Sequence, residues 1–154
     1  MKPSLFVFDL DFTLWNAGGT WCDCTTPPYK LENGIIRDSY GLKISLYPDV
    51  LEIINELKRQ NCQLALASRT EEPSWAVQLL ELFNIRHLFE FEEIYPTRKT
   101  VHFNSIQAKS GVPYNKMVFF DDEYRNIEDV SKLGVRCVYV NRGIEKYMFR
   151  EYLD

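Results

Sequence analysis

Two aspartates, Asp9 and Asp11, stand two residues apart at the end of an apolar segment, residues 5–8. This segment is typical of a short buried strand, so both carboxyl groups are expected where the strand ends. Two carboxylates this close together are costly to keep charged without a cation or a shared proton. Open parallel sheets bind ligands at the carboxyl ends of their strands. The spacing therefore predicts an acidic site that holds a metal ion and carries out chemistry.

Three more polar clusters follow predicted strands or begin a predicted helix. Carboxylate oxygens from two strands suit Mg²⁺, a hard cation. A hydroxyl and an ammonium group suit the non-bridging oxygens of a phosphoryl group. Together these side chains predict a site that holds a phosphate group against a metal ion. The clusters are Ser68 and Arg69 after residues 63–67, Arg98 and Lys99 at the start of a helix over 99–110, and Asp121 and Asp122 after residues 117–120.

The elements that position these residues alternate between strand and helix along the chain. Alternation of this kind predicts an α/β fold with a Rossmann-like, doubly wound and mainly parallel sheet. Residues 34–38 and 42–46 flank a turn and predict a small hairpin. We expect one domain over residues 1–154, with residues 15–46 as a flap. The spacing leaves no room for a separate cap domain.

Composition restricts the partners. The chain has 154 residues and a net charge of −4, which disfavours nucleic acid because binding to its phosphates needs clustered Lys and Arg. No apolar stretch approaches the ~20 residues of a membrane span, and no secretory signal is evident, so a cytoplasmic location without membrane contact is expected. The oligomeric state is left open.

The same residues resemble the four motifs of the haloacid dehalogenase (HAD) superfamily. The resemblance spans essentially the whole chain. In detail, the motifs are similar to those of the small magnesium-dependent phosphatases of that superfamily. It implies a capless enzyme that hydrolyses phosphomonoesters with Mg²⁺ through an aspartyl-phosphate. The segments that carry it are FDLDFTLW from residue 8, ASRT from residue 67, KTVHF from residue 99, and FFDDE from residue 119, followed by Arg125, Asn126 and Ile127.

The resemblance also implies roles at the first motif. Asp9 would be the nucleophile and a ligand of Mg²⁺. Asp11 would be the general acid/base, with its backbone carbonyl on the metal. The backbone N–H of Leu10 would contact the phosphoryl oxygens. An acid at position 11 favours phosphoryl transfer over dehalogenation, because a halide leaves without a proton.

Roles for the other motifs follow in the same way. Ser68 and Lys99 would bind the phosphoryl group. Arg69 would contact that group or the leaving group, or else pair with a nearby acidic residue. Asp122 would complete the metal site with Asp121 beside it, and which of the two binds directly is left open.

An open site predicts bulky phosphorylated substrates, such as phosphosugars, phosphotyrosine, or a phosphorylated or glycated protein. The alternatives are a receiver-like signalling module, a phosphate-binding protein without turnover, and a sugar-phosphate mutase. A receiver carries its phosphorylated aspartate on a central strand, whereas Asp9 follows the first strand of the chain.

Aromatic residues of the flap either form a rim over the site or pack beneath the flap, and packing is expected. His102 is expected to be structural. The aromatic residues concerned are Trp15, Trp21, Tyr29 and Tyr40.

Overall fold

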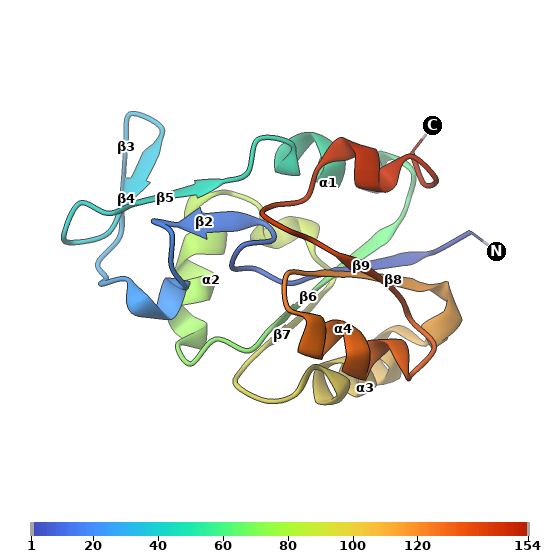
Figure 1. Ribbon diagram of the computed structural model, residues 1–154. Helices are drawn as coiled ribbons and strands as arrows, with labels where there is room; N and C mark the ends of the chain where they lie inside the picture. The colour runs from blue at the N-terminus through green and yellow to red at the C-terminus, as the bar shows by residue number, and fades with distance from the viewer. Residues whose placement is uncertain (1, 154) are drawn as a thin grey trace.

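A computed structural model describes residues 2–153 and shows a five-stranded parallel sheet at the centre of the protein (Figure 1). Every neighbouring pair in this sheet is parallel, so the predicted α/β, Rossmann-like fold is confirmed. In sheet order the strands are β7 (Phe91–Ile94), β6 (Gln63–Ser68), β1 (Leu5–Phe8), β8 (Met117–Asp121) and β9 (Arg136–Tyr139).

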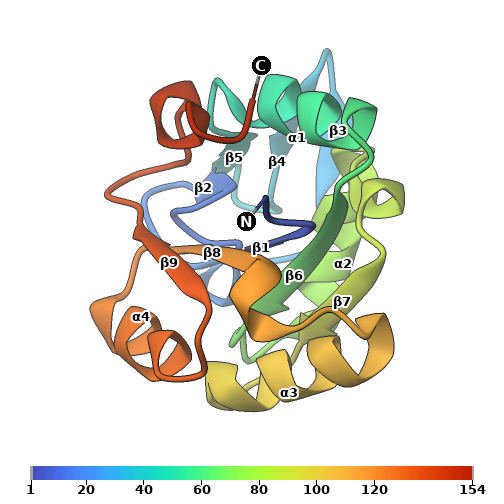
Figure 2. The same cartoon turned by 90° about the vertical axis from the view of Figure 1, so that its right-hand side faces the viewer.

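Helices cover both faces of this sheet (Figure 2). α1 (Val50–Arg59) and the C-terminal 3₁₀ helix η4 (Lys146–Phe149) lie on one face, and α3 (Lys99–Ser110) and α4 (Tyr124–Ser131) lie on the other. The three central strands β6, β1 and β8 are mostly apolar on both sides for this reason, whereas the edge strands β7 and β9 carry charged residues. The remaining helices are α2 (Pro73–Leu82), η1 (Cys22–Cys24), η2 (Arg86–Leu88) and η3 (Tyr114–Lys116).

β1 illustrates how the sequence builds the two-sided core. All four of its residues are buried. Phe6 and Phe8 point into the cluster beneath α1, whereas Leu5 and Val7 point into the cluster that α3 and α4 cover. The two clusters follow from the two-residue alternation of a strand. Because β1 packs into both of them, it is buried on both faces at the centre of the sheet.

The flap is larger than the predicted hairpin. The predicted pair corresponds to β4 (Ile35–Arg37) and β5 (Lys43–Leu46), but β2 (Trp15–Ala17) and β3 (Lys30–Glu32) extend it to a four-stranded antiparallel sheet in the order β2-β5-β4-β3. Strands of three residues are too short for an alternating pattern to show in the sequence. Figure 1 shows this second sheet at one end of the molecule.

The predicted site residues lie at the carboxyl ends of three adjacent strands and at the start of one helix. Asp9 directly follows β1, Ser68 ends β6 and Asp121 ends β8, while Lys99 begins α3. β1 is both first in the chain and central in the sheet. The central position of the strand before Asp9 therefore does not distinguish this protein from a receiver. Only the place of that strand in the chain, as the first strand, distinguishes the two. No helix within residues 2–153 is long and apolar enough to cross a membrane.

Candidate active site

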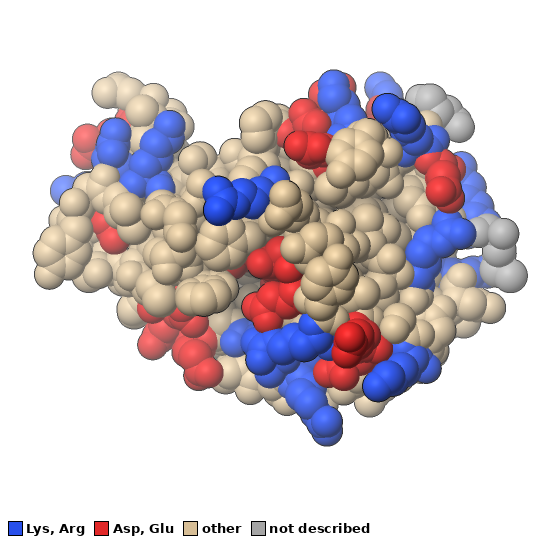
Figure 3. All heavy atoms as spheres, in the orientation of Figure 1, with Lys and Arg blue, Asp and Glu red and all other residues tan. Residues whose placement is uncertain are grey.

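A cavity of about 270 Å³ opens at the carboxyl ends of β1, β6 and β8. Acidic side chains gather at the centre of this face, with basic side chains beside them (Figure 3). Six of the predicted site residues line the cavity together, whereas Leu10 and Asp121 are fully buried behind it. The six are Asp9, Asp11, Ser68, Arg69, Lys99 and Asp122; the other lining residues are Trp21, Asp23, Thr70, Glu71, Glu123, Arg125 and Asn126.

Three carboxylates form a cluster that suits a divalent cation. One oxygen from each of Asp9, Asp121 and Asp122 lies within 4.8 Å of the others. Burial and the neighbouring charge of Asp121 raise the pKa of Asp9 well above its ordinary value, and burial raises that of Asp122 to about 6. Hard oxygen donors of this kind fit Mg²⁺, and the cation would favour their charged forms.

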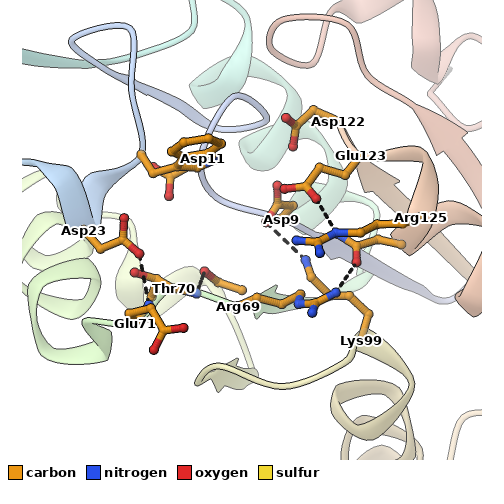
Figure 4. A pocket seen from close by; sticks show the side chains of 13 residues that line it. Asp9, Asp11, Asp23, Arg69, Thr70, Glu71, Lys99, Asp122, Glu123 and Arg125 are labelled. Atoms are coloured by element: carbon orange, nitrogen blue, oxygen red, sulfur yellow. Dashed lines mark hydrogen bonds and ion pairs between the residues drawn. The ribbon is translucent and has the colours of Figure 1, made fainter.

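Lys99 is the cation that the chain itself provides. Its side chain is only 1% exposed, and Nζ donates to Asp9 Oδ1 at 3.1 Å, to Asp121 Oδ2 at 2.9 Å and to the carbonyl of Ala67. Burial alone would lower the pKa of the ammonium, but the two carboxylates outweigh burial and raise it. Lys99 is therefore charged, and Figure 4 shows it reaching Asp9 from α3.

Asp121 and Asp122 differ in what their carboxylates contact. Asp121 is fully buried, and its Oδ1 accepts the backbone N–H of Glu123 at 2.8 Å. Its Oδ2 accepts from Asn126 Nδ2 at 3.1 Å as well as from Lys99. Asp122 lines the cavity instead. The oxygens of Asp121 are thus already engaged by the protein, whereas Asp122 faces the cavity.

Asp11 lies on the side of the cavity nearer Asp23, whereas Asp122 lies nearer Glu123 (Figure 4). Its Oδ1 accepts the indole N–H of Trp15 at 2.7 Å and the backbone N–H of Cys22 at 2.9 Å. Burial raises the pKa of Asp11 to about 6, and these two hydrogen bonds oppose the rise. A carboxyl group with this pKa can both give and take a proton near neutral pH.

The turn that directly follows Asp11 is tightly held. Phe12 has a φ of +63°, in the left-handed region that a non-glycine residue rarely adopts. Two backbone bonds from the C-terminal segment secure the turn: Gly143 N–H donates to the Phe12 carbonyl at 2.8 Å, and Ile144 N–H to the Thr13 carbonyl at 3.0 Å. The chain thus maintains the strained conformation of the residue next to Asp11.

The phosphate side of the cavity has its own hydrogen bonds. Ser68 Oγ accepts the backbone N–H of Thr70 at 3.3 Å, which leaves its hydroxyl hydrogen free to donate. Arg69 donates to Asn126 Oδ1 at 3.0 Å rather than to one of the acidic residues considered from the sequence. Asn126, which the sequence only suggested as part of the last motif, therefore joins Arg69 to Asp121.

The flap aromatics divide into two groups. Trp15 and Tyr29 are buried, in agreement with the expected packing, whereas Trp21 and Tyr40 are 51% and 85% exposed. Trp21 lines the cavity and its ring meets that of Phe12 edge-on, so the expected packing beneath the flap is wrong for Trp21, which lies at the rim. His102 is buried, and its Nε2 lies 2.9 Å from the carbonyl of Tyr95, which agrees with a structural role.

Comparison with known proteins places the chain in a family. A family model described as Acid Phosphatase matches residues 1–154. The human protein named "Magnesium-dependent phosphatase 1" is 46% identical, over 99% of this chain and 86% of its own length. An HAD-like hydrolase superfamily protein of Schizosaccharomyces pombe is 40% identical over 86% of this chain and 83% of its own length.

Solved structures support the fold. An HAD family enzyme from Bacteroides thetaiotaomicron has a TM-score of 0.72 at 15% identity, over 97% of this chain and all of that one. An HAD-superfamily hydrolase from Ehrlichia chaffeensis has a TM-score of 0.68 at 14% identity, over 98% and 96% of the two chains. The chain belongs to the acid phosphatase family, and its predicted membership among the magnesium-dependent phosphatases of the HAD superfamily is confirmed.

Proposed function

We propose that this magnesium-dependent phosphatase hydrolyses phosphomonoesters in two steps through an aspartyl-phosphate on Asp9. The observation that supports it is the placement of Asp9 between two different groups in one cavity. The Lys99 ammonium lies 3.1 Å from one of its oxygens, and Asp11, a carboxyl group with a pKa of about 6, lines the same cavity. A nucleophile, a cation for the phosphoryl oxygens and an acid for the leaving group are the parts this reaction needs.

Asp9 and Asp122 would hold Mg²⁺ with their side chains, and Asp11 with its backbone carbonyl. Asp121 would act behind them by fixing Lys99, because both of its oxygens already accept hydrogen bonds from the protein. When bound, Mg²⁺ supplies positive charge that offsets the charge of the phosphoryl oxygens. Ser68 and Lys99 would donate to the same oxygens, with the backbone N–H of Leu10, and Arg69 would meet the substrate at the edge of the cavity.

In the first step, a carboxylate oxygen of Asp9 forms a bond to phosphorus and the bond from phosphorus to the leaving oxygen breaks. Asp11 gives its proton to that oxygen. In the second step, Asp11 takes a proton from water as the water oxygen attacks phosphorus, and Asp9 leaves as a free carboxylate. Asp11 thus returns to its starting state after each cycle.

The test measures phosphate release from para-nitrophenyl phosphate with Mg²⁺ or EDTA. Wild type should turn over only with Mg²⁺, and Asp9→Asn should lose turnover because an amide is not a nucleophile here. Asp129→Asn, a matched change on α4 outside the cavity, serves as the control. Turnover that survives Asp9→Asn contradicts the mechanism, and a phosphoenzyme that forms without turnover favours the receiver-like alternative.

For the substrate, we propose bulky phosphomonoesters, including phosphotyrosine or a phosphosugar carried on a protein. The support is an open cavity on a face whose flap is a small sheet, with Arg69 and Arg125 among its lining residues. A phosphotyrosine peptide should therefore have a higher kcat/KM than free phosphotyrosine. Equal values for the peptide and the free amino acid would contradict this substrate class.

A further inference from the structure

Trp15 is buried beside the cavity, and the proposed reaction assigns it no role. It is 0% exposed, and its indole stacks on the ring of Phe83 with centroids 6.0 Å apart and planes 29° apart. Its packing therefore fixes the plane of the indole. The indole N–H in that plane donates to Asp11 Oδ1 at 2.7 Å, the shorter of the two hydrogen bonds to that oxygen.

The second hydrogen bond to Asp11 Oδ1 also comes from the flap. It is the backbone N–H of Cys22, at 2.9 Å, while the Cys22 thiol lies 3.6 Å from the hydroxyl of Thr70. A carboxyl oxygen that accepts two N–H groups has no free lone pair for a proton. The proton of Asp11 therefore resides on Oδ2, which accepts neither of these two N–H groups.

We infer that Trp15 is a positioning residue for proton transfer: its indole N–H orients Asp11 so that Oδ2 carries the proton to the leaving oxygen. This inference rests on the proposed role of Asp11 as general acid/base. Without the indole N–H, Oδ1 keeps the Cys22 N–H as its one donor and has a free lone pair, so either oxygen can carry the proton. Only the two proton transfers of Asp11 are then impaired, and the first of them is the transfer to the leaving oxygen.

The proton transfer from Asp11 to the leaving oxygen matters to different degrees for different leaving groups. As Asp9 bonds to phosphorus, the electron pair of the breaking bond goes to the leaving oxygen, which takes the proton from Asp11 Oδ2. A nitrophenolate is stable without that proton, whereas a phenolate depends on it more. The value of kcat/KM covers the steps up to the departure of this group, so comparing two aryl phosphates isolates the proton transfer.

The experiment compares Trp15→Phe with wild type on phenyl phosphate and on para-nitrophenyl phosphate. Phenylalanine keeps an aromatic ring against Phe83 but lacks the N–H. General acid catalysis contributes about 10²–10⁴-fold, so we expect kcat/KM to fall about 10-fold or more on phenyl phosphate and less than about 3-fold on para-nitrophenyl phosphate. Trp75→Phe, a matched change in α2, should change neither value. Equal losses on both substrates, or no loss, overturn the inference.

A measurement on the intact indole covers the case in which Trp15→Phe does not fold. The chain has three tryptophans, so its ¹⁵N-labelled spectrum holds three indole N–H signals to assign. The Trp15 signal should exchange slowly with solvent in wild type and faster in Asp11→Asn, whose neutral amide is a weaker acceptor. An unchanged Trp15 signal overturns the inference. If Asp11→Asn keeps full activity on phenyl phosphate, the proposed role of Asp11 fails instead.

Discussion

Replacing Lys99 with methionine is expected to destabilise the protein strongly and in a pH-dependent way. Methionine has a similar length but no charge, so the change leaves the buried Asp9 and Asp121 carboxylates without their ammonium partner. At an effective dielectric constant of about 20, each attraction at ~3 Å amounts to about 5 kcal/mol. The cost of burying the ammonium offsets much of this sum. Removing one member of a buried ion pair costs about 3–5 kcal/mol in net free energy of unfolding.

The loss should grow as pH rises. Burial and the charge of Asp121 already raise the pKa of Asp9, and Lys99 opposes that rise. Without Lys99 the pKa of Asp9 rises further, so the folded variant binds more protons than its unfolded chain. Stability then falls as pH increases above the ordinary Asp value, because a protonated carboxyl group tolerates burial better than a charged one. The free energy of unfolding should therefore differ from wild type more at pH 7 than at pH 5.

The assay is urea unfolding at pH 5 and pH 7, with EDTA present so that no divalent cation replaces the ammonium. Lys146→Met provides the control, because Lys146 pairs with Glu52 at 3.1 Å with both side chains more than half exposed. Exposed pairs contribute at most about 1 kcal/mol. A Lys99→Met variant as stable as wild type at pH 7, or equally destabilised at both pH values, would refute the electrostatic reasoning.

Three further predictions concern backbone, histidine and metal. Gly143→Ala should lower the free energy of unfolding by about 1–3 kcal/mol more than Gly19→Ala. The two glycines have similar φ values, +80° and +84°, but only at position 143 does the added methyl group overlap the ring of Tyr47. Equal losses in urea unfolding would contradict this. Burial lowers the pKa of His102 from 6.5 to about 4, so as the pH falls the unfolded chain binds a proton at this residue before the folded protein does. Between pH 6.5 and 4 the free energy of unfolding of wild type should therefore fall by up to about 3 kcal/mol relative to that of His102→Gln. Parallel stability curves for the two proteins would exclude this titration. Mg²⁺ at 100 times its Kd for wild type should stabilise wild type by about 2.7 kcal/mol in thermal unfolding, and the same concentration should stabilise Asp122→Asn far less. An equal gain for the two proteins would show that Asp122 is not a ligand.

The sequence predicts the parts of the site that depend on strand ends. Asp9, Ser68 and Asp121 each stand where an apolar segment stops, and parallel strands bring their carboxyl ends to one edge of a sheet. Because the alternation of strand and helix was regular, the central sheet was predictable as well. Lys99 could be placed because a helix start fixes its position relative to β7 and the sheet.

The contacts that orient those residues could not be predicted. Trp15 and Cys22 reach Asp11 only because the flap folds back over the first motif, and Asn126 reaches Arg69 across 57 residues of chain. Such contacts depend on side-chain directions in three dimensions, for which periodicity carries no signal. The same holds for β3, whose three residues are all exposed and give no apolar pattern.

The two backbone bonds from Gly143 and Ile144 to the first motif have a consequence for synthesis. A ribosome makes Asp9 and Asp11 well before the segment that closes the turn after Asp11, because Gly143 and Ile144 lie far along the chain from Phe12 and Thr13. Domains fold as their chain becomes available, so a nascent chain without this segment contains every predicted catalytic residue but lacks the closure that holds Phe12 in its strained conformation. The proposed competence for catalysis is therefore acquired only after the segment that contains Gly143 and Ile144 has left the ribosome.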